Sequence, residues 1–282
     1  MATFATSDQL LVIIDPAARQ TDAESVRIAK DVLSAGAATK VCLPEGPEEF
    51  ARALGRRGSR RPVLIGDDRT LVRAVTLLHR QRELARCALA VVPVGRTALA
   101  ESLGVPSGAV AAARAVLDGA ERRLDMLVDD SDGVVLGALG IPSAPVREPA
   151  APVPLSAGRS WYRSLVRLGA RPARLPAVPS PGATRLRVEV DGEPVVDLDQ
   201  PVEAVSVAPG PGGVASVEVR PLSVGAEATP LLASGRTVTV TGADFRYRAD
   251  ATVCGPVRRR TWRVMESAWA LTLPATGPAT DI

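Results

Sequence analysis

The alternation of apolar runs with amphipathic segments in the first hundred residues limits the fold of this chain most strongly. Continuous apolar runs with the length of buried strands occur at residues 10–14, 62–65 and 87–94, and a shorter apolar run follows Lys40 in the strand expected at residues 40–43. Segments with helical spacing of apolar residues separate these runs, at residues 47–54, 70–84 and 97–103 and in a stretch that a Thr21–Glu24 capping box opens and Gly36 closes. Strands and helices that alternate in this way predict a parallel sheet flanked by helices.

The last third of the chain follows a different period. Residues 186–190 alternate apolar and polar side chains, and Asp191-Gly192 then provides a hairpin turn. Further short runs of this kind occur at residues 202–207, 214–219, 237–241, 245–248 and 262–273. Short strands separated by Gly and Pro turns predict an all-β sandwich.

Between these two parts, residues 142–181 are rich in Pro, Ala, Ser and Arg, with a few apolar residues around Trp161 at helical spacing. We therefore expect an α/β nucleotide-binding-like domain at residues 1–142, a Pro-rich linker with a short helix at 143–183 and a β-sandwich acceptor domain at 184–282.

The composition excludes several classes of function. A net charge of +3 and an aromatic content of 3% argue against a basic field or a base-stacking platform, so we expect no nucleic-acid partner. His79 is the only histidine, and Cys42, Cys87 and Cys254 are too far apart in the sequence for a paired metal or redox motif. Three scattered cysteines, no signal peptide and no long apolar run predict a cytoplasmic protein without a metal site built from Cys and His.

The first candidate loop follows the strand at residues 62–65 and reads Gly66-Asp67-Asp68-Arg69-Thr70. A turn from a strand into a helix presents backbone N–H groups to a bound phosphate. Two adjacent carboxylates would repel a polyphosphate unless magnesium or Arg69 neutralises them. The alternative is a structural turn in which an aspartate caps the following helix.

The second candidate loop follows residues 91–94 and begins Gly95-Arg96-Thr97. A strand, a Gly-Gly-Asp-Gly-Thr turn and a helix, followed by a strand and a Pro-Leu-Gly-Thr-Gly-Asn-Asp loop, characterise the diacylglycerol kinase catalytic family, which includes bacterial lipid kinases and sphingosine kinases. This chain resembles a divergent, actinobacterial-type member of that family. Asp15-Pro16 stands where the family has Asn-Pro, and residues 237–262 resemble its closing strands.

The resemblance implies an ATP-dependent lipid kinase with a fold like that of NAD kinase and diacylglycerol kinase. The N-terminal domain would bind ATP and Mg²⁺, and the γ-phosphoryl group would pass to a lipid hydroxyl in the cleft between the domains. Asp68 would be the catalytic residue. The residues implied to bind the cofactor are Asp15, Arg19, Gly66, Asp67, Asp68, Arg69, Thr70, Gly95, Arg96 and Thr97.

Several family positions are filled differently in this chain. Asp67 and Arg69 stand at loop positions where the family has glycine, and the chain contains no asparagine at all. Thr252 occupies the position of the glutamate taken to be the general base, and a threonine hydroxyl cannot accept a proton near neutral pH. The family's lid is missing where residues 208–213 run directly into Val214.

These departures leave three functions open. The first is an active lipid kinase with degraded motifs. The second is a catalytically silent relative that binds nucleotide, lipid or a protein partner. The third is an enzyme related to NAD kinase, which shares a Gly-Gly-Asp motif.

The expected partners follow from the same resemblance and from the arginines. Lys30 and Lys40 are the only lysines, so almost all basic residues are arginine. Two arginine-rich segments, at residues 56–61 and at residues 79–86, indicate either a transient contact with a membrane surface or an ordinary solvated surface. The near-neutral balance of charge over the whole chain argues against strong electrostatic docking. We expect a lipid-like acceptor and a cytoplasmic location, and both a location peripheral to the membrane and a homodimer are left open.

Overall fold

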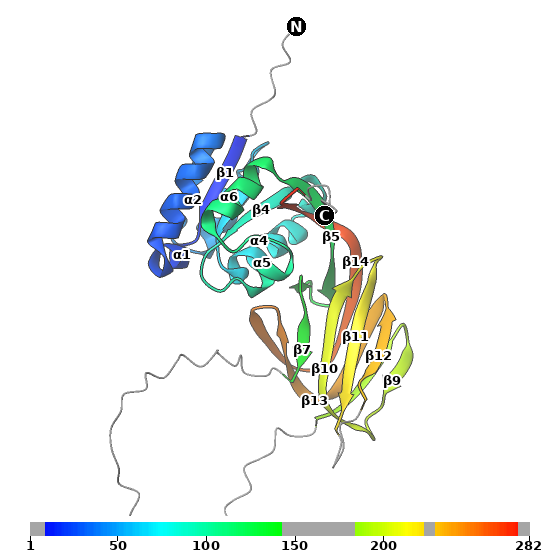
Figure 1. The fold of residues 1–282 in the computed structure, drawn as a ribbon. Coiled ribbons are helices and arrows are strands. Elements are labelled where there is room, and N and C mark those ends of the chain that lie inside the picture. The colour runs from blue at the N-terminus through cyan, green and yellow to red at the C-terminus, as the bar shows by residue number, and fades with distance from the viewer. Residues whose placement is uncertain (1–8, 143–183, 223–228, 276–282) are drawn as a thin grey trace, which may run out of the picture.

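The computed structural model describes residues 9–142, 184–222 and 229–275 (Figure 1). The helix predicted around Trp161 lies outside these residues. Within them strands predominate, and helices are concentrated in the N-terminal part (Figure 1).

The apolar runs of the first hundred residues form four parallel strands, as predicted. They are β1 (Gln9–Ile14), β2 (Ala38–Cys42), β3 (Arg61–Gly66) and β4 (Ala88–Pro93), in the spatial order β2-β1-β3-β4. The apolar side chains of β1, β3 and β4 are buried. Because both faces of these strands are covered, successive residues are apolar instead of alternating between apolar and polar.

Helices connect these strands. They are α1 (Pro16–Thr21), α2 (Ala23–Gly36), α3 (Pro47–Gly55), α4 (Asp68–Arg80), α5 (Ala98–Ser102), α6 (Ala109–Asp118) and the short 3₁₀ helix η1 (Leu84–Arg86). Helix α2 packs against α6, and α3 packs against α4.

Two predicted helix boundaries were wrong. The cap of α2 is Asp22, whose carboxylate accepts a hydrogen bond from the Ser25 amide at 3.0 Å, whereas Thr21 ends α1 and donates to the carbonyl oxygen of Ala17 at 2.8 Å. Helix α4 ends at Arg80 rather than at residue 84, because Arg82 has a φ of 58° and therefore cannot continue a right-handed helix.

The remaining strands are mostly antiparallel. They are β5 (Ala120–Asp129), β6 (Val134–Val135), β7 (Leu139–Ile141), β8 (Thr184–Val190), β9 (Glu193–Val196), β10 (Pro201–Gly210), β11 (Val214–Pro221), β12 (Leu231–Gly235), β13 (Thr237–Ala249) and β14 (Thr252–Leu273). The predicted hairpin turn joins β8 to β9, with positive φ values of 51° at Asp191 and 89° at Gly192.

Strand β14 links the two ends of the structure. It pairs with β13 and β5, and near its C-terminal end it also runs parallel to β4, with Ala270 opposite Ala88. Through this contact the described strands form one connected set of 14.

Two hydrophobic cores lie along this set of strands. The first contains the parallel strands and their helices, and the second contains the apolar side chains of β7, β8, β10, β11 and β13. Leu139 and Ile141 belong to the second core although they precede residue 142, and Leu271 and Leu273 belong to the first. The division into domains at residues 142 and 184 stays a prediction.

None of the helices in the described ranges has the length and hydrophobicity needed to cross a membrane.

Candidate functional site

The loops that follow β1, β3 and β4 meet at the carboxyl edge of the parallel sheet. The amide of Asp15 donates to the carbonyl oxygen of Ile65 at 2.9 Å, and the amide of Asp68 donates to the carbonyl oxygen of Arg96 at 2.9 Å. The structure therefore brings together the loops that the sequence singled out. Ligands of open parallel sheets bind at this edge.

Asp68 is buried and holds the start of α5. Its two carboxylate oxygens accept hydrogen bonds from the amides of Leu99 and Ala100, both at 3.0 Å. Burial raises the pKa of Asp68 against the effect of these two bonds, and the nearby carboxylates of Asp67 and Glu101 add to the rise. The two amides that could receive an anion at the start of α5 are thus already bonded within the protein.

Asp67 caps α4, and the Thr70 hydroxyl lies within hydrogen-bond distance of both Asp67 and Asp15. The Oδ1 atom of Asp67 accepts from the Thr70 amide at 3.0 Å and from the Thr70 hydroxyl at 3.1 Å. The same hydroxyl lies 3.1 Å from Asp15 Oδ2, while Asp15 Oδ1 caps α1 by accepting from the Ala17 amide at 2.8 Å. The prediction that an aspartate of residues 66–70 caps the following helix is therefore confirmed.

The two loop glycines have different roles. A Cβ atom at Gly66 would lie 2.7 Å from the Thr70 hydroxyl and 3.1 Å from Asp15 Cβ, so the absence of a side chain allows the loops to pack closely. Gly95 has a φ of +96°, a conformation that favours glycine. Both requirements come from the protein's own backbone and side chains.

An exposed arginine also follows each of these three strands, within α1, at the start of α4 and in the loop after β4. These are Arg19 after β1, Arg69 after β3 and Arg96 after β4. In the described part of the structure none of the three has an ion-pair partner. Thr97, beside Arg96, uses its hydroxyl to bond Glu101 Oε1 at 2.7 Å.

One contributor to this edge was not anticipated from the sequence. Arg73, on α4, lies 3.6 Å from Asp15 Oδ2, and its guanidinium group stands 5.7 Å from the centre of the Phe50 ring. The only sequence signal for it is its position four residues after Arg69, one helical turn along the same face.

The turn between β13 and β14 reaches this region from the C-terminal part of the chain. The carboxylate of Asp250 accepts from the amides of Leu136, Gly137 and Ala138 at 2.8, 2.8 and 3.1 Å. Burial raises the pKa of Asp250 despite these bonds, and the negative charge of Asp68 adds to the rise. Thr252, at the position of the expected base, is exposed and carries no carboxylate.

The carboxylates of this edge do not form a metal site. Within residues 9–142, 184–222 and 229–275, no group of three or more Asp, Glu, His or Cys side chains is placed to hold a cation. Both oxygens of Asp68 are taken by backbone amides, and Asp15 and Asp67 are bonded to Thr70 and to their own helices. This donor set does not fit a bound Mg²⁺.

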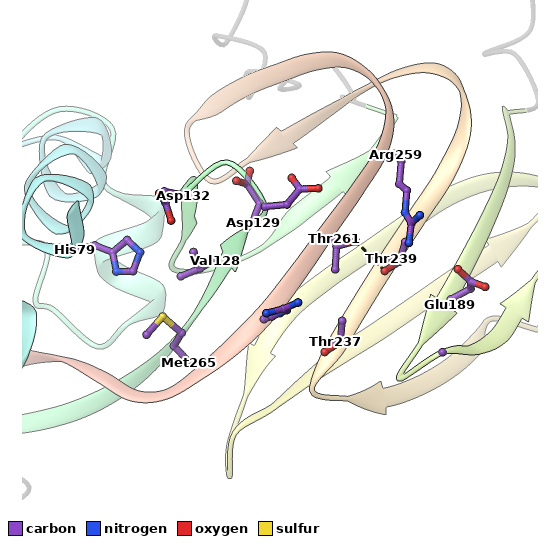
Figure 2. A pocket seen from close by; sticks show the side chains of 13 residues that line it. His79, Val128, Asp129, Asp132, Glu189, Thr237, Thr239, Arg259, Thr261 and Met265 are labelled. Atoms are coloured by element: carbon purple, nitrogen blue, oxygen red, sulfur yellow. Dashed lines mark hydrogen bonds between the residues drawn. The ribbon is translucent and has the colours of Figure 1, made fainter. Parts of the chain in front are cut away.

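Another pocket is lined by residues of strands β5, β8, β13 and β14 and by His79 near the end of α4 (Figure 2). Its volume is about 720 Å³, and its lining includes the ring of His79, the threonines 237, 239 and 261, and the arginines 259 and 263. Glu189 is paired with Arg187, and Asp130 with Arg260. Because the lining contains none of the loop residues after β1, β3 and β4, this pocket is separate from the candidate site.

Comparison with known proteins identifies the fold. The chain matches no protein-family model and no curated protein sequence. It does match solved structures, among them a "putative diacylglycerol kinase" from Bacillus anthracis str. Sterne, with a TM-score of 0.68 and 13% identity over 98% of this chain and 99% of that chain. Another structure from the same organism, of a diacylglycerol kinase, has a TM-score of 0.68 and 12% identity over the same shares of both chains.

The chain therefore has a diacylglycerol kinase-like fold along almost its whole length. This agrees with the diacylglycerol kinase-like fold that the sequence resemblance implied, while the division into two domains stays a prediction. Identities of 12–13% show the fold alone, because unrelated functions share folds, so activity, cofactor and substrate require a separate argument.

Proposed function

We propose that this protein is a catalytically silent member of the diacylglycerol kinase fold that binds a phosphate-bearing ligand at the loops after β1, β3 and β4. In this proposal the chain consists of three parts. They are an α/β domain with a parallel sheet flanked by helices (residues 1–142), a linker (143–183) and a β-sandwich domain (184–282). The ligand is a nucleotide or a phospholipid headgroup, which share the phosphate that the loops would recognise.

The observation that carries the proposal is the bonding of Asp68. A phosphate-binding helix start needs free amides, and here the amides of Leu99 and Ala100 both donate to the Asp68 carboxylate. Asp67 occupies the start of α4 in the same way. A polyphosphate would have to displace these carboxylates or share their space, which repulsion between negative charges opposes.

The exposed arginines provide a different means of binding phosphate. Arg19 in α1, Arg69 at the start of α4 and Arg96 follow three adjacent strands, and a guanidinium group matches two phosphate oxygens at once. Binding through side chains would hold a phosphate above the loops rather than within them. No catalytic base is needed for this role, and none is available from Thr252.

An ATP-dependent lipid kinase is the second candidate, and the full-length similarity to diacylglycerol kinase structures supports it. In that case Asp68 and Thr70 would meet the phosphates of Mg-ATP, and another group would replace the missing base. This candidate requires α5 and its loop to rearrange so that the Leu99 and Ala100 amides become free.

Thermal-shift titrations test the binding role. Inorganic phosphate, ATP without Mg²⁺ and phosphatidic acid in micelles should each be titrated, since a ligand of the folded state raises its stability in proportion to ln(1 + [L]/Kd). We expect a shift with at least one of them, without a need for Mg²⁺. The Arg19→Gln/Arg69→Gln/Arg96→Gln variant should lose the shift.

A matched control separates this site from net charge. The Arg236→Gln/Arg246→Gln/Arg259→Gln variant removes the same charge from exposed arginines of the C-terminal part and should keep the full shift. No shift with any of the three ligands, or equal loss in both variants, would contradict the proposed site.

A turnover assay separates the two candidate functions. The protein is incubated with Mg-ATP and diacylglycerol vesicles, and we expect no phosphatidic acid above the level without protein. Phosphatidic acid that forms with the wild type and disappears with folded Asp68→Asn would establish the kinase instead.

A further inference from the structure

Exposed arginines gather at the amino edge of the parallel sheet, opposite the candidate site. The connection from α3 to β3 carries Arg56 and Arg60, and the connection from α4 to β4 carries Arg80, Arg82 and Arg86. Strands β3 and β4 are parallel neighbours, so the chain enters both of them at the same edge.

Direct contacts join these connections. Arg57 Nη2 lies 2.7 Å from Glu83 Oε2, and Arg57 and Glu83 line the same shallow depression, about 470 Å³ in volume, with Gly55, Gly58 and Gln81. Strand β5 joins them at this edge, because Arg123 Nη2 donates to the carbonyl oxygen of Ala85 at 3.0 Å. The two connections that carry these arginines therefore lie side by side at this edge.

The positive charge of this surface is not balanced by nearby carboxylates. We call Arg56, Arg60, Arg80, Arg82 and Arg86 the arginine edge. Within the described residues none of these five guanidinium groups has an ion-pair partner, and all but the half-buried Arg60 are exposed. Glu83, which lies in the same connection as Arg82 and Arg86, is already paired with the buried Arg57.

We propose that the arginine edge docks the protein onto an anionic phospholipid surface. Guanidinium groups bind phosphate oxygens well, and each basic residue near an anionic bilayer strengthens association about fivefold. The large apolar side chains that are exposed in the described residues lie outside these connections, so nothing here inserts into the hydrocarbon. Association is electrostatic and reversible.

A lipid surface fits this edge better than nucleic acid does. No Trp, Tyr or Phe belongs to residues 55–61 or 80–87, so the edge offers no ring for base stacking. A local cluster of arginines is sufficient for a surface where many phosphates are present side by side.

Docking by this edge has a consequence for orientation. The loops after β1, β3 and β4 lie at the opposite edge of the sheet and would face away from the bilayer. Together with the proposed function, on which this step rests, the orientation favours a soluble phosphate compound over a membrane lipid as the ligand.

Vesicle sedimentation tests the docking surface. The full chain is mixed with vesicles of phosphatidylcholine alone or of phosphatidylcholine with phosphatidylglycerol, at low and at physiological salt. We expect binding only to the anionic vesicles, weakened by salt. The Arg56→Gln/Arg82→Gln/Arg86→Gln variant should bind on the order of a hundredfold more weakly, since three arginines are removed.

The control variant Arg236→Gln/Arg246→Gln/Arg259→Gln loses the same charge and should keep most of the vesicle binding. Thermal melting confirms that both variants are folded. Equal binding to neutral and anionic vesicles, or equal loss in both variants, overturns the proposal. Absent vesicle binding together with binding to duplex RNA that the arginine-edge variant loses assigns the surface to nucleic acid instead. These outcomes do not depend on ligand binding at the opposite loops.

Discussion

Two adjacent aspartates at the end of β3 have different surroundings. The Asp67 side chain caps the helix to which it leads, and the Asp68 side chain crosses to another loop and caps α5. The sequence Asp67-Asp68 is compatible with a phosphate loop, a metal ligand pair or a structural turn. The hydrogen bonds give each carboxylate a structural role.

Replacing Asp68 with alanine should lower stability markedly. The change leaves two buried amides without an acceptor, which costs about 2–3 kcal/mol of the free energy of unfolding. Urea denaturation of Asp68→Ala measures this loss. The neighbouring Arg69→Ala, at an exposed position without a described partner, should stay within about 0.5 kcal/mol of the wild type. A loss below that limit in Asp68→Ala would show that its cap contributes little.

Asp129 predicts a measurable dependence of stability on acid. Burial opposes its ionisation, but hydrogen bonds from the Ser131 hydroxyl and amide and from the Gly133 amide outweigh burial and hold its pKa below the ordinary value of 3.8. A depressed folded-state pKa gives stability that is present above pH 3.8 and is lost as the pH falls through the folded-state pKa.

In the Asp129→Asn variant this part of the acid sensitivity should disappear. Denaturant midpoints measured from neutral pH down to the acid limit of the folded protein give the comparison. Asp132→Asn is the matched control, since Asp132 is exposed in the same turn with a φ of 60°, which asparagine tolerates. An unchanged acid slope in Asp129→Asn would contradict the assignment.

At the scale of elements, periodicity predicted the parallel strands and α3 because their apolar runs are distinct. The boundary of α2 was misplaced because Thr21 and Asp22 are both good caps, and only the backbone decides which one caps. Helix α6 was missed: its sequence, rich in Ala and Val, has little contrast between a buried and an exposed face.

The position of the candidate site could be predicted from the sequence, but the hydrogen-bond partners of its side chains could not. Loops after parallel strands converge at one edge, so Asp15, Gly66 and Gly95 could be grouped from the sequence. The partners of Asp68 lie 31 and 32 residues away, and those of Asp250 lie more than 110 residues away. No local pattern encodes bonds across such separations.

The hydrogen bonds that Asp250 accepts from three distant amides can be tested by mutation. Asp250→Ala removes the acceptor of three amides and should cost about 2–4 kcal/mol. Hydrogen exchange should accelerate at Leu136, Gly137 and Ala138 before it does so in β13. Asp244→Ala, which breaks only an exposed pair with Arg258, should change stability by less than about 1 kcal/mol. Unchanged exchange at the three amides would remove Asp250 from this role.

At the scale of the whole molecule, β14 makes the two cores depend on each other. This strand of 22 residues places Trp262 in the second core and Trp269 in the first, both fully buried. Its pairing with β5 spans the distance between them. A sequence divided into an α/β part and a β part predicts two separable folding units, whereas the shared strand favours one.

Cooperative unfolding distinguishes these expectations. Two variants would each retain one tryptophan, Trp262 or Trp269, with the other and Trp161 replaced by phenylalanine, so that fluorescence reports on one core at a time. Because strand β14 cannot leave one core without disturbing the other, we expect the two urea transitions to coincide once each variant is referred to its own midpoint by circular dichroism. The Leu271→Ala substitution, in the first core, should lower the free energy of unfolding reported by Trp262 as well as that reported by Trp269, by about 2–5 kcal/mol in each case. A shift confined to Trp269 would show that the cores unfold independently and that the chain consists of two separate folding units joined only by hydrogen bonds along β14.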